Sequence, residues 1–547
     1  MARSRTGRRW HAVQGSKSVK TLSLFWLGTA LFALGMSRTA AATSCTDLAG
    51  LQLQDTTITT AAVVPAGSFT PTGATAPITN LPEFCRVAGV IAPTPDSSIG
   101  FEVWLPTGWN GRYLQSGNGG FAGAIPYTAL GKGIARGYAT AGTDDGHQAG
   151  GRDASWALGD PEKIIDFGYR SLHLTALRSK EVVAAFYQAA PRRSYFEGCS
   201  DGGRESLMEA QRYPDDFDGW VVGAPAYNWT NLLTAHAWNQ QAVAADRASA
   251  LTPEALQTLS QAVIARCDAR DGVVDGIIST PQRCSPRPRD LVCQADETAN
   301  CLTPSQAEAA EAIYAGAVTP ETGRIYPGWP AGHEAEPGNW PAWITGPDAA
   351  QLAFSTNFFA YMVYDNPSLS VSSINIADAF QAAEARVGPI LNSTDTDTDT
   401  DLGRIRAGGK KIIHYHGWAD AAISTRGSID YYRNVATRLG RANQDFYRLF
   451  LLPGMGHCTG GPGPNNIGQL SAPAGSLADP EHNVLGALQR WVEDGVAPDS
   501  IIATKYASDD PAQTVLRTRP ICPYPQEAEY KGDGSTDDAA NFICVRR

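Results

Sequence analysis

Short hydrophobic segments recur along the chain between glycines, prolines and polar residues, and their lengths predict β-strands. The clearest are rich in β-branched and aromatic residues and cover residues 85–91, 99–106, 112–116, 138–143, 219–226, 411–417 and 446–452. Apolar residues at helical spacing predict helices over residues 164–187, 428–439 and 484–494. This alternation of strands and helices is typical of an α/β fold with a mostly parallel sheet.

The alternation stops in the middle of the chain. Residues 227–400 are rich in Ala and Trp, contain four of the cysteines and show helical stretches without clear strands. We therefore expect an inserted lid over residues 227–400, between a first part of the sheet domain at 43–226 and a second part at 401–547.

The N-terminus has the pattern of a signal peptide over residues 1–42. Basic residues up to Lys20 precede an apolar run at 22–36, and the small residues 39–42 follow it. An uncleaved anchor is the alternative, but the run is short for a membrane span and no later stretch reaches that length. We expect a secreted or periplasmic protein that begins near Thr43 and has no membrane contact after cleavage.

Composition adds little to this picture beyond one exclusion. The 547 residues are 43% hydrophobic and 18% charged, with a formal net charge of −11. The predicted mature part has no basic run, so nucleic acid and anionic membranes are not expected partners.

A candidate nucleophile lies in the sequence Gly198-Cys199-Ser200-Asp201-Gly202. The β-favouring Tyr195 and Phe196 precede this G-x-S-x-G pattern, and a helical run begins at Arg204. A strand, a sharp turn and a helix form the nucleophile elbow, in which the positions flanking a strained serine must be small. A chance match in a chain with 55 glycines is the alternative, but the flanking elements favour a catalytic Ser200.

A serine needs a base that takes its proton and an acid that orients the base. In α/β-hydrolases the triad residues follow the order Ser, acid, His along the chain, and the acid and the histidine lie on loops after late strands. Asp420 follows the predicted strand 411–417, and His457 follows the strand 446–452. His147 is a rival base, but it precedes the serine. His414 and His416 lie within a predicted strand, so we expect packing or supporting roles for them.

A glycine-rich loop, Gly117–Gly123, directly follows the predicted strand 112–116. α/β-hydrolases place one N–H donor of the oxyanion hole on such a loop, and the N–H of the residue after the nucleophile is the other donor. We therefore expect the N–H groups of Asp201 and of Gly119 or Gly120 to act here. A phosphate-binding loop is the alternative, but the Lys-Ser/Thr of a P-loop is absent.

All 10 cysteines follow the predicted cleavage site, and an even count in an exported chain implies disulfides. Proximity in sequence suggests the pairs Cys45–Cys85, Cys267–Cys284, Cys293–Cys301 and Cys522–Cys544, which leaves Cys199 and Cys458 for each other. The last pair would join the neighbours of Ser200 and His457. Metal ligation by the cysteines is the alternative, but the chain has no C-x-x-C pair.

Within the predicted lid, Asp268, Asp271 and Asp275 lie close together and are separated by glycine turns. Their carboxylates, with the backbone carbonyls of Val273 and Ile277, can surround one hard cation. The alternative from spacing alone is a pair of ordinary Asp-Gly turns.

The combination of Cys199-Ser200, Asp420 and His457-Cys458 resembles the CS-D-HC motif of the tannase and feruloyl esterase family. The resemblance extends to the glycine-rich loop, to residues 453–458 and to the set of cysteine pairs. It implies an α/β-hydrolase with a lid and serine esterase activity on aromatic esters. It also implies a structural Ca²⁺ on Asp268, Asp271, Val273, Asp275 and Ile277, and it places the second oxyanion donor on Gly120.

The predicted lid contains several aromatic residues that could stack on a phenolic ring; packing in the core of the lid is the alternative for each of them. We expect Trp340, Trp343 and Phe358 of the lid, and Ile423 after the acid, to contact a feruloyl or galloyl ester. The related mono(2-hydroxyethyl) terephthalate hydrolases use a lid arginine for the substrate carboxylate, whereas residues 349–361 contain none. Such a hydrolase is the alternative within the family; a peptidase or acyltransferase on the same fold, or a non-catalytic binding module, are the alternatives of other classes.

Overall fold

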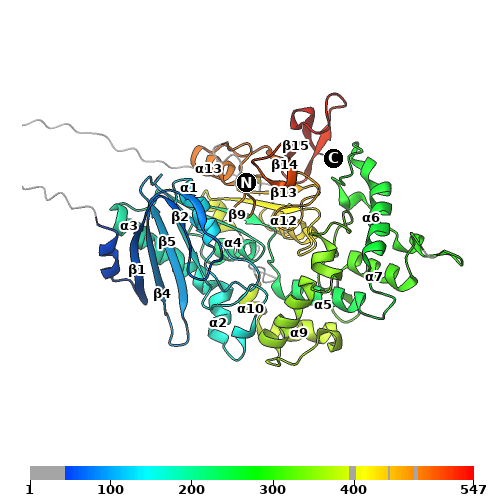
Figure 1. Cartoon of the computed structure of the whole chain (residues 1–547), viewed down its shortest axis with the longest axis horizontal. Coiled ribbons are helices and arrows are strands. Elements are labelled where there is room, and N and C mark those ends of the chain that lie inside the picture. The colour runs from blue at the N-terminus through cyan, green and yellow to red at the C-terminus, as the bar shows by residue number, and fades with distance from the viewer. Residues whose placement is uncertain (1–42, 298, 393–401, 441–443, 474–478, 547) are drawn as a thin grey trace, which may run out of the picture. The chain divides into compact units, whose positions relative to one another are not determined.

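A nine-stranded mixed sheet lies at the centre of the fold (Figure 1). The computed structural model describes residues 43–297, 299–392, 402–440, 444–473 and 479–546, so the predicted signal peptide over 1–42 lies outside the described residues. In spatial order the strands are β1 (Thr56–Val64), β4 (Phe84–Ile91), β5 (Ile99–Pro106), β7 (Ala139–Thr143), β6 (Arg112–Ser116), β8 (Arg193–Cys199), β9 (Gly219–Gly223), β12 (Lys411–Gly417) and β13 (Tyr447–Leu452).

The sheet is antiparallel at its β1 end and parallel from β7 to β13. Every residue of β7 and of β9 is buried, as expected for parallel strands that are covered on both faces. The predicted strands correspond to β4–β7, β9, β12 and β13, with ends that differ by at most three residues. The prediction of an α/β fold with a mostly parallel sheet is confirmed.

Helices cover both faces of the sheet. On one face α1 (Tyr127–Ala135) packs on β5, β6 and β7, and α13 (Val484–Asp494) packs on β9 and β12. On the other face, α3 (Ser171–Tyr187), α4 (Asp201–Arg212) and α12 (Thr425–Leu439) share a core with Trp220 and Val222.

The helix predicted over residues 164–187 is interrupted near its start. α2 (Pro161–Ile165) is followed by a π-helical turn, Asp166–Arg170, before α3 begins. This turn leaves the carbonyls of Phe167 and Gly168 to accept hydrogen bonds from the Arg204 guanidinium at 3.0 and 2.8 Å. A widened turn of this kind is frequent near functional sites.

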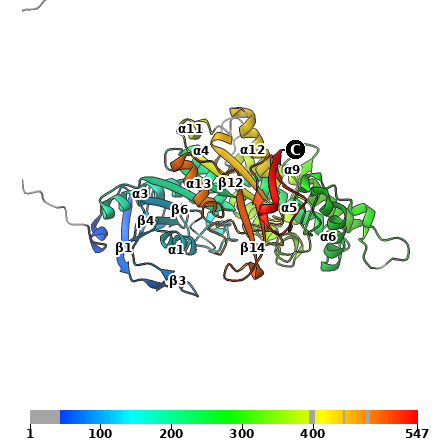
Figure 2. The same ribbon diagram turned by 90° about the horizontal axis from the view of Figure 1, so that it is seen from above.

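The segment between β9 and β12 is mainly helical, as predicted. Its described helices are α5 (Trp229–Val243), α6 (Pro253–Cys267), α7 (Pro304–Ala315), α8 (Ala350–Asn357), α9 (Ile376–Arg386) and α10 (Gly388–Leu391), with the short strands β10 (Val318–Thr319) and β11 (Gly323–Arg324). Figures 1 and 2 both show α5 and α6 beyond the end of the sheet opposite β1. We call this segment, residues 227–400, the insertion.

The insertion packs into a core that it shares with the sheet domain. Leu232 and Leu259 of the insertion lie in one buried cluster with Phe121, Phe167 and Ala421 from outside it. The chain then passes through α11 (Gly403–Ala407) into β12.

Two hairpins at the C-terminus and one near the N-terminus were not predicted. They pair β14 (Ile501–Tyr506) with β15 (Val515–Ile521), β16 (Gln526–Tyr530) with β17 (Phe542–Arg546), and β2 (Gly67–Phe69) with β3 (Ile78–Leu81). No helix in the described ranges is long and apolar enough to cross a membrane.

Candidate active site

Ser200 occupies a sharp turn between β8 and α4. Its backbone has φ 69° and ψ −120°, a strained conformation that an L-residue rarely adopts. A Cβ atom on Gly198 would lie 2.4 Å from the carbonyl oxygen of Gly202. The turn therefore requires glycine at position 198, and this geometry is that of a nucleophile elbow.

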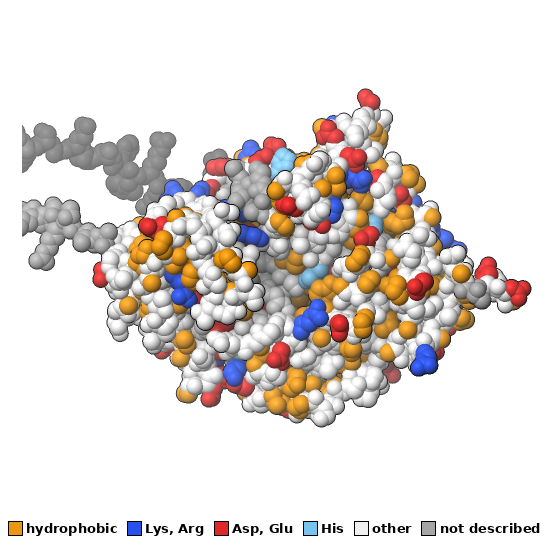
Figure 3. Space-filling model, viewed as in Figure 1, with side chains coloured by type: hydrophobic (Ala, Val, Ile, Leu, Met, Phe, Trp, Pro, Cys, Tyr) orange, Lys and Arg blue, Asp and Glu red, His pale blue; other side chains and the backbone are white. Residues whose placement is uncertain are grey.

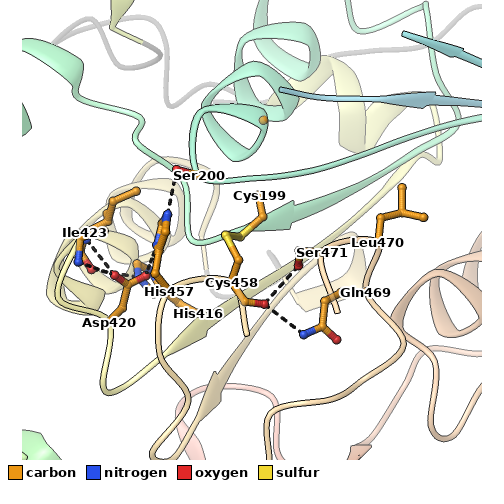
Figure 4. The surroundings of a disulfide bond; sticks show 12 residues. Cys199, Ser200, His416, Asp420, Ile423, His457, Cys458, Gln469, Leu470 and Ser471 are labelled. Atoms are coloured by element: carbon orange, nitrogen blue, oxygen red, sulfur yellow. Dashed lines mark hydrogen bonds and ion pairs between the residues drawn. A yellow bond between two sulfur atoms is a disulfide. The ribbon is translucent and has the colours of Figure 1, made fainter. Parts of the chain in front are cut away.

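Ser200, His457 and Asp420 form a chain of hydrogen bonds (Figure 4). The Ser200 Oγ lies 2.8 Å from His457 Nε2, and His457 Nδ1 lies 2.8 Å from Asp420 Oδ2. Because the carboxylate only accepts, Nδ1 carries the proton and Nε2 can accept one from the serine hydroxyl. The structure thus brings together the three side chains predicted as a triad, in an arrangement that can activate a nucleophile.

The Asp420 carboxylate is held from several directions. Its Oδ1 accepts hydrogen bonds from the N–H groups of Ala422 and Ile423 at 2.8 and 2.9 Å. His416 Nε2 lies 3.2 Å from Asp420 Oδ2, and its Nδ1 lies 2.7 Å from Ser428 Oγ. His416 therefore has the supporting position expected of it.

The surroundings keep Asp420 ionised. Its burial acts to raise the pKa, but the His457 and His416 imidazoles and their hydrogen bonds outweigh burial and hold the pKa below its usual range. A charged Asp420 stabilises the proton on His457 Nδ1 and any positive charge that develops on that ring.

The rival base His147 lies in a different environment. Its Nε2 is 2.7 Å from the carbonyl oxygen of Phe121, and its ring stacks on Trp156 with centroids 3.8 Å apart. Burial lowers the pKa of His147 to about 4. The ring is therefore a packing group whose hydrogen-bond partners are backbone carbonyls rather than Ser200.

A disulfide joins the chain neighbours of the serine and the histidine. Cys199 and Cys458 are bonded across a Cα–Cα distance of 6.0 Å (Figure 4). The carbonyl of Cys458 also accepts hydrogen bonds from Gln469 and Ser471, each 3.1 Å long. All five predicted pairs are confirmed, namely 45–85, 199–458, 267–284, 293–301 and 522–544.

The glycine-rich loop packs directly against the elbow. The Asn118 carbonyl accepts the Gly202 N–H at 2.8 Å. Gly120 has φ 63°, and a Cβ atom there would lie 2.0 Å from the Gly151 carbonyl oxygen. Within the described part of the chain, the N–H groups of Gly120 and Asp201 donate to no other residue. These are the two donors predicted for an oxyanion hole.

A cavity of about 740 Å³ contains Ser200, His457 and Gly120 in its lining. Figure 3 shows a hollow near the middle of the space-filling view, with a histidine side chain visible in it. The insertion contributes Trp343 and Phe354, whose rings stack at an interplanar angle of 7°. Trp343 also meets the His457 ring edge-on, with centroids 4.9 Å apart. Trp343 is therefore where the prediction placed it.

The other three predicted substrate-binding residues do not line this cavity. Trp340 is 1% exposed and packs on Tyr314, and Phe358 is fully buried against Phe359. Ile423 is 3% exposed, and its backbone N–H and carbonyl serve Asp420 and His416. The expectation failed because aromatic content alone does not distinguish the core of the insertion from its cavity wall.

Sequence reasoning missed other residues of the cavity wall. The cavity is also lined by Tyr127 and Lys132 of α1, by Ile78 of β3 and by Leu470. Lys132 Nζ donates to the carbonyls of Leu470 and Ala472 at 2.5 and 2.7 Å. The sequence position of α1 could have indicated these residues. Because α1 starts just after the glycine-rich loop, its first turn must lie near the nucleophile.

The predicted calcium loop is closed by the Cys267–Cys284 disulfide. Asp268 Oδ2 accepts the Gly276 N–H at 3.1 Å, and Asp271 accepts the N–H groups of Val273 and Ser279 at 3.0 and 2.8 Å. Asp275 pairs with Arg517 and Arg519 of β15 at 2.9 Å each.

The residues of this loop fit a hard cation by donor type, because every candidate ligand atom is an oxygen. Burial raises the pKa of Asp271, because the hydrogen bonds that its carboxylate accepts from Ser279 and Val273 do not fully offset the loss of hydration. Among described residues, however, the groups of three or more His, Cys, Asp or Glu with ligand atoms within 4.8 Å of one another do not include these aspartates. The carboxylates would have to turn inward to share one ion.

Comparison with known proteins gives a consistent result over nearly the whole chain. The family model described as "Tannase and feruloyl esterase" matches residues 85–545. An uncharacterized esterase of Xanthomonas campestris is 44% identical, over 94% of each chain. A probable feruloyl esterase B of Aspergillus clavatus is 35% identical, over 85% of this chain and 86% of its own.

Solved structures agree with these sequence matches. The crystal structure of feruloyl esterase B from Aspergillus oryzae has a TM-score of 0.84 and 32% identity, and the match covers 92% of this chain and 99% of that one. The tannin acyl hydrolase of Aspergillus niger has a TM-score of 0.70 at 24% identity, over 90% and 92% of the chains, which shows the same fold.

Proposed function

The chain belongs to the tannase and feruloyl esterase family and is a carboxylic ester hydrolase, and from this premise we propose that it cleaves feruloyl or galloyl esters through an acyl-enzyme on Ser200. The observation that carries the proposal is the hydrogen-bonded chain from Ser200 through His457 to Asp420, with both links at 2.8 Å.

In the first half of the reaction, Ser200 Oγ attacks the ester carbonyl while His457 Nε2 takes its proton. Asp420 keeps the other ring nitrogen protonated and stabilises the imidazolium. The N–H groups of Asp201 and Gly120 receive the oxyanion, and the proton on His457 passes to the leaving alcohol. Water then attacks the acyl-enzyme by the same sequence, releasing the acid.

The cavity wall supports an aromatic acyl group. The stacked rings of Trp343 and Phe354 lie beside His457 and offer a flat apolar surface. A phenolic ring gains from stacking on such a surface. Similar proteins are named as feruloyl esterases, which favours a hydroxycinnamoyl group for this chain.

The decisive assay compares methyl ferulate, methyl gallate and mono(2-hydroxyethyl) terephthalate with the purified protein. We expect turnover of ferulate or gallate, and a loss of about 10⁴-fold or more in Ser200→Ala. Ser179→Ala, in a buried serine of α3 that does not line the cavity, is the matched control. Substantial activity in Ser200→Ala would contradict the proposed nucleophile.

Lys132 supports a second candidate within the same class. It is the only lysine or arginine among the described residues that line the cavity, so a substrate with a carboxylate, such as the terephthalate monoester, has one cation to approach. If this ester is preferred, Lys132→Met should raise its KM and leave that of methyl ferulate unchanged.

We also propose that the loop 268–277 binds Ca²⁺ as a structural ion, through the carboxylates of Asp268, Asp271 and Asp275 and the carbonyls of Val273 and Ile277. Support comes from the all-oxygen donor set and the buried Asp271. Chelation should lower the Tm, and added Ca²⁺ should restore it. In Asp271→Asn the Tm should no longer respond to chelator. An unchanged wild-type Tm, with no calcium by elemental analysis, would refute this site.

Finally, we propose that the protein is exported with residues 1–42 removed. The five disulfides support an oxidising compartment. N-terminal sequencing of the protein from the secreted or periplasmic fraction should give a start near Thr43; retention of the first 42 residues would indicate an anchor instead.

A further inference from the structure

Three carboxyl groups lie buried together behind the elbow. Asp145 follows β7, and Asp201 and Glu205 come from the first two turns of α4; none of the three has any exposed surface. One ligand oxygen of each lies within 4.8 Å of the others. The Arg204 guanidinium pairs with one of them, and its Nε lies 2.5 Å from Asp201 Oδ1. Three negative charges beside one positive charge are unfavourable in such a site.

The hydrogen bonds indicate which carboxyl is neutral. Asp145 accepts from the Ser171 hydroxyl at 2.8 Å and from the Asn118 side-chain amide at 3.0 Å, and Asp201 has the Arg204 guanidinium. Burial raises the pKa of both aspartates above its usual range, but these partners oppose that effect and favour the ionised form of each.

Glu205 has weaker support for a charge. Its Oε2 accepts one backbone N–H, that of Asn118 at 2.9 Å, while its Oε1 and the Oδ2 of Asp201 are buried without a partner. A proton on Glu205 removes one negative charge and turns an unpaired acceptor into a donor beside the aspartates.

The electrostatic surroundings act in the same direction. Burial raises the pKa of Glu205 well above its ordinary value, and the neighbouring Asp145 and Asp201 raise it further, while Arg204 opposes them. Among the described residues, these three are the charged groups that act on Glu205, and they come from the loop after β7 and from α4 itself. The other polar neighbours, Asn118 and Ser171, carry no charge.

We propose that Glu205 acts as a neutral carboxyl that positions the oxyanion loop, residues 117–120, against the nucleophile elbow. This proposal rests on the proposed function, because it assigns the loop its catalytic role. Glu205 Oε2 holds the Asn118 N–H, and the Asn118 carbonyl in turn holds the Gly202 N–H at 2.8 Å. A Cβ atom on Gly117 would lie 2.5 Å from Glu205 Oε2, so loop and carboxyl are in close contact.

Neutrality matters because of what the loop is expected to bind. The N–H groups of Gly120 and Asp201 stabilise a developing negative charge, and another anion behind them would oppose that effect. Loss of the side chain has a different consequence, since it releases the Asn118 N–H and lets Gly120 move relative to Asp201.

The kinetic test compares Glu205→Gln with Glu205→Ala on methyl ferulate at neutral pH. Glutamine is neutral, has the same shape and can both accept from Asn118 and donate to the aspartates, so kcat should stay within about threefold of wild type. Alanine should lower kcat by about 10²-fold with little change in KM, as expected when an oxyanion donor is displaced.

Glu209 provides a matched control on the same helix. It is fully buried, both its oxygens lack a partner, and burial together with Asp216 raises its pKa well above the ordinary value. Within the described part of the chain, its carboxyl makes no hydrogen bond to the oxyanion loop. Glu209→Ala should therefore leave kcat of the folded enzyme within about twofold of wild type, even if its Tm falls.

Infrared difference spectroscopy reads the protonation state directly. The spectrum of wild type minus Glu205→Gln at neutral pH should contain the C=O stretch of a protonated carboxylic acid. This readout needs no substrate, so it remains informative if the esters are not turned over. Absence of the band, or a Glu205→Gln variant as inactive as Glu205→Ala, would overturn the proposal. A lack of activity in the wild type would instead refute the proposed function.

Discussion

The sheet and the insertion contribute to the same cavity by different means. Ser200, Asp420 and His457 follow β8, β12 and β13, and hydrogen bonds and a disulfide fix them. Trp343 and Phe354 come from the insertion and are held by ring packing. The difference indicates that backbone geometry determines the chemistry, whereas side-chain packing determines the shape of the pocket.

The sharpest test of the sheet side is Asp420→Asn. The amide keeps the shape of the carboxylate but presents donors as well as acceptors, so His457 loses its preferred tautomer. We expect kcat to fall by about 10⁴-fold with little change in Tm. Asp430→Asn, which breaks a partly exposed ion pair with Arg324, is the control and should leave kcat unchanged. Activity above a tenth of wild type would mean that another group orients His457.

The next test removes the Cys199–Cys458 link by changing both residues to serine. Displacement of the serine and histidine loops by about 1 Å can cost about 10²-fold in rate, so we expect a loss of about 10- to 100-fold in kcat. The Cys293–Cys301 pair lies in the insertion and spans only 8 residues. Its replacement by serines should change kcat less than twofold. Equal losses of kcat in both variants would show that the disulfide beside the triad matters no more for catalysis than the one in the insertion.

Substitution of two tryptophans tests which part of the insertion forms the cavity wall and which part forms its core. Trp343→Ala removes the ring beside His457 and should raise KM for methyl ferulate about tenfold. Trp340→Ala leaves a cavity in the core and should lower the free energy of unfolding by about 3–5 kcal/mol without changing KM. Kinetic titrations and denaturant unfolding of both variants measure this. If Trp340→Ala changed KM and Trp343→Ala did not, the cavity wall would be misassigned.

The smallest expected effect concerns His236 of α5, whose Nε2 donates to the Ala422 carbonyl at 2.9 Å. Burial lowers its pKa from 6.5 to about 4. As pH falls below 6.5, the unfolded chain takes up a proton that the folded state refuses, so stability decreases.

This term should amount to about 1 kcal/mol of unfolding free energy between pH 7 and 5.5. In His236→Gln, the decrease in stability over that interval should be smaller by this amount, measured by denaturant unfolding at both pH values. An identical decrease in the two proteins would show that His236 is protonated in the folded state.

The difference between the sheet and the insertion also explains which features could be predicted from the sequence. Strands such as 411–417 carry a local pattern, and the order Ser200, Asp420, His457 follows from the fold, so both were predictable. The hairpin β14–β15 was missed because its residues are partly exposed and lack strong alternation. Trp340 and Phe358 were misplaced because burial within the insertion depends on contacts distant in sequence.

Glu205 shows a stronger limit of sequence reasoning. All residues of α4 from Asp201 to Ala210 are buried, including Arg204, Glu205 and Glu209. Charged residues on a helix ordinarily indicate a solvent-facing side. Here they face the loop after β7, the π-helical turn and Asp216, and only the three-dimensional arrangement reveals those partners.

The Cys199–Cys458 bond also closes a covalent ring around the whole insertion, because the two cysteines are separated by 259 positions. Ser200 and His457 lie just inside the two ends of that ring. A protease that cuts once anywhere between them produces two fragments, one with the serine and one with the histidine, which stay linked. Such a nicked protein retains both reacting groups in one molecule, so the insertion can be cleaved without separating them.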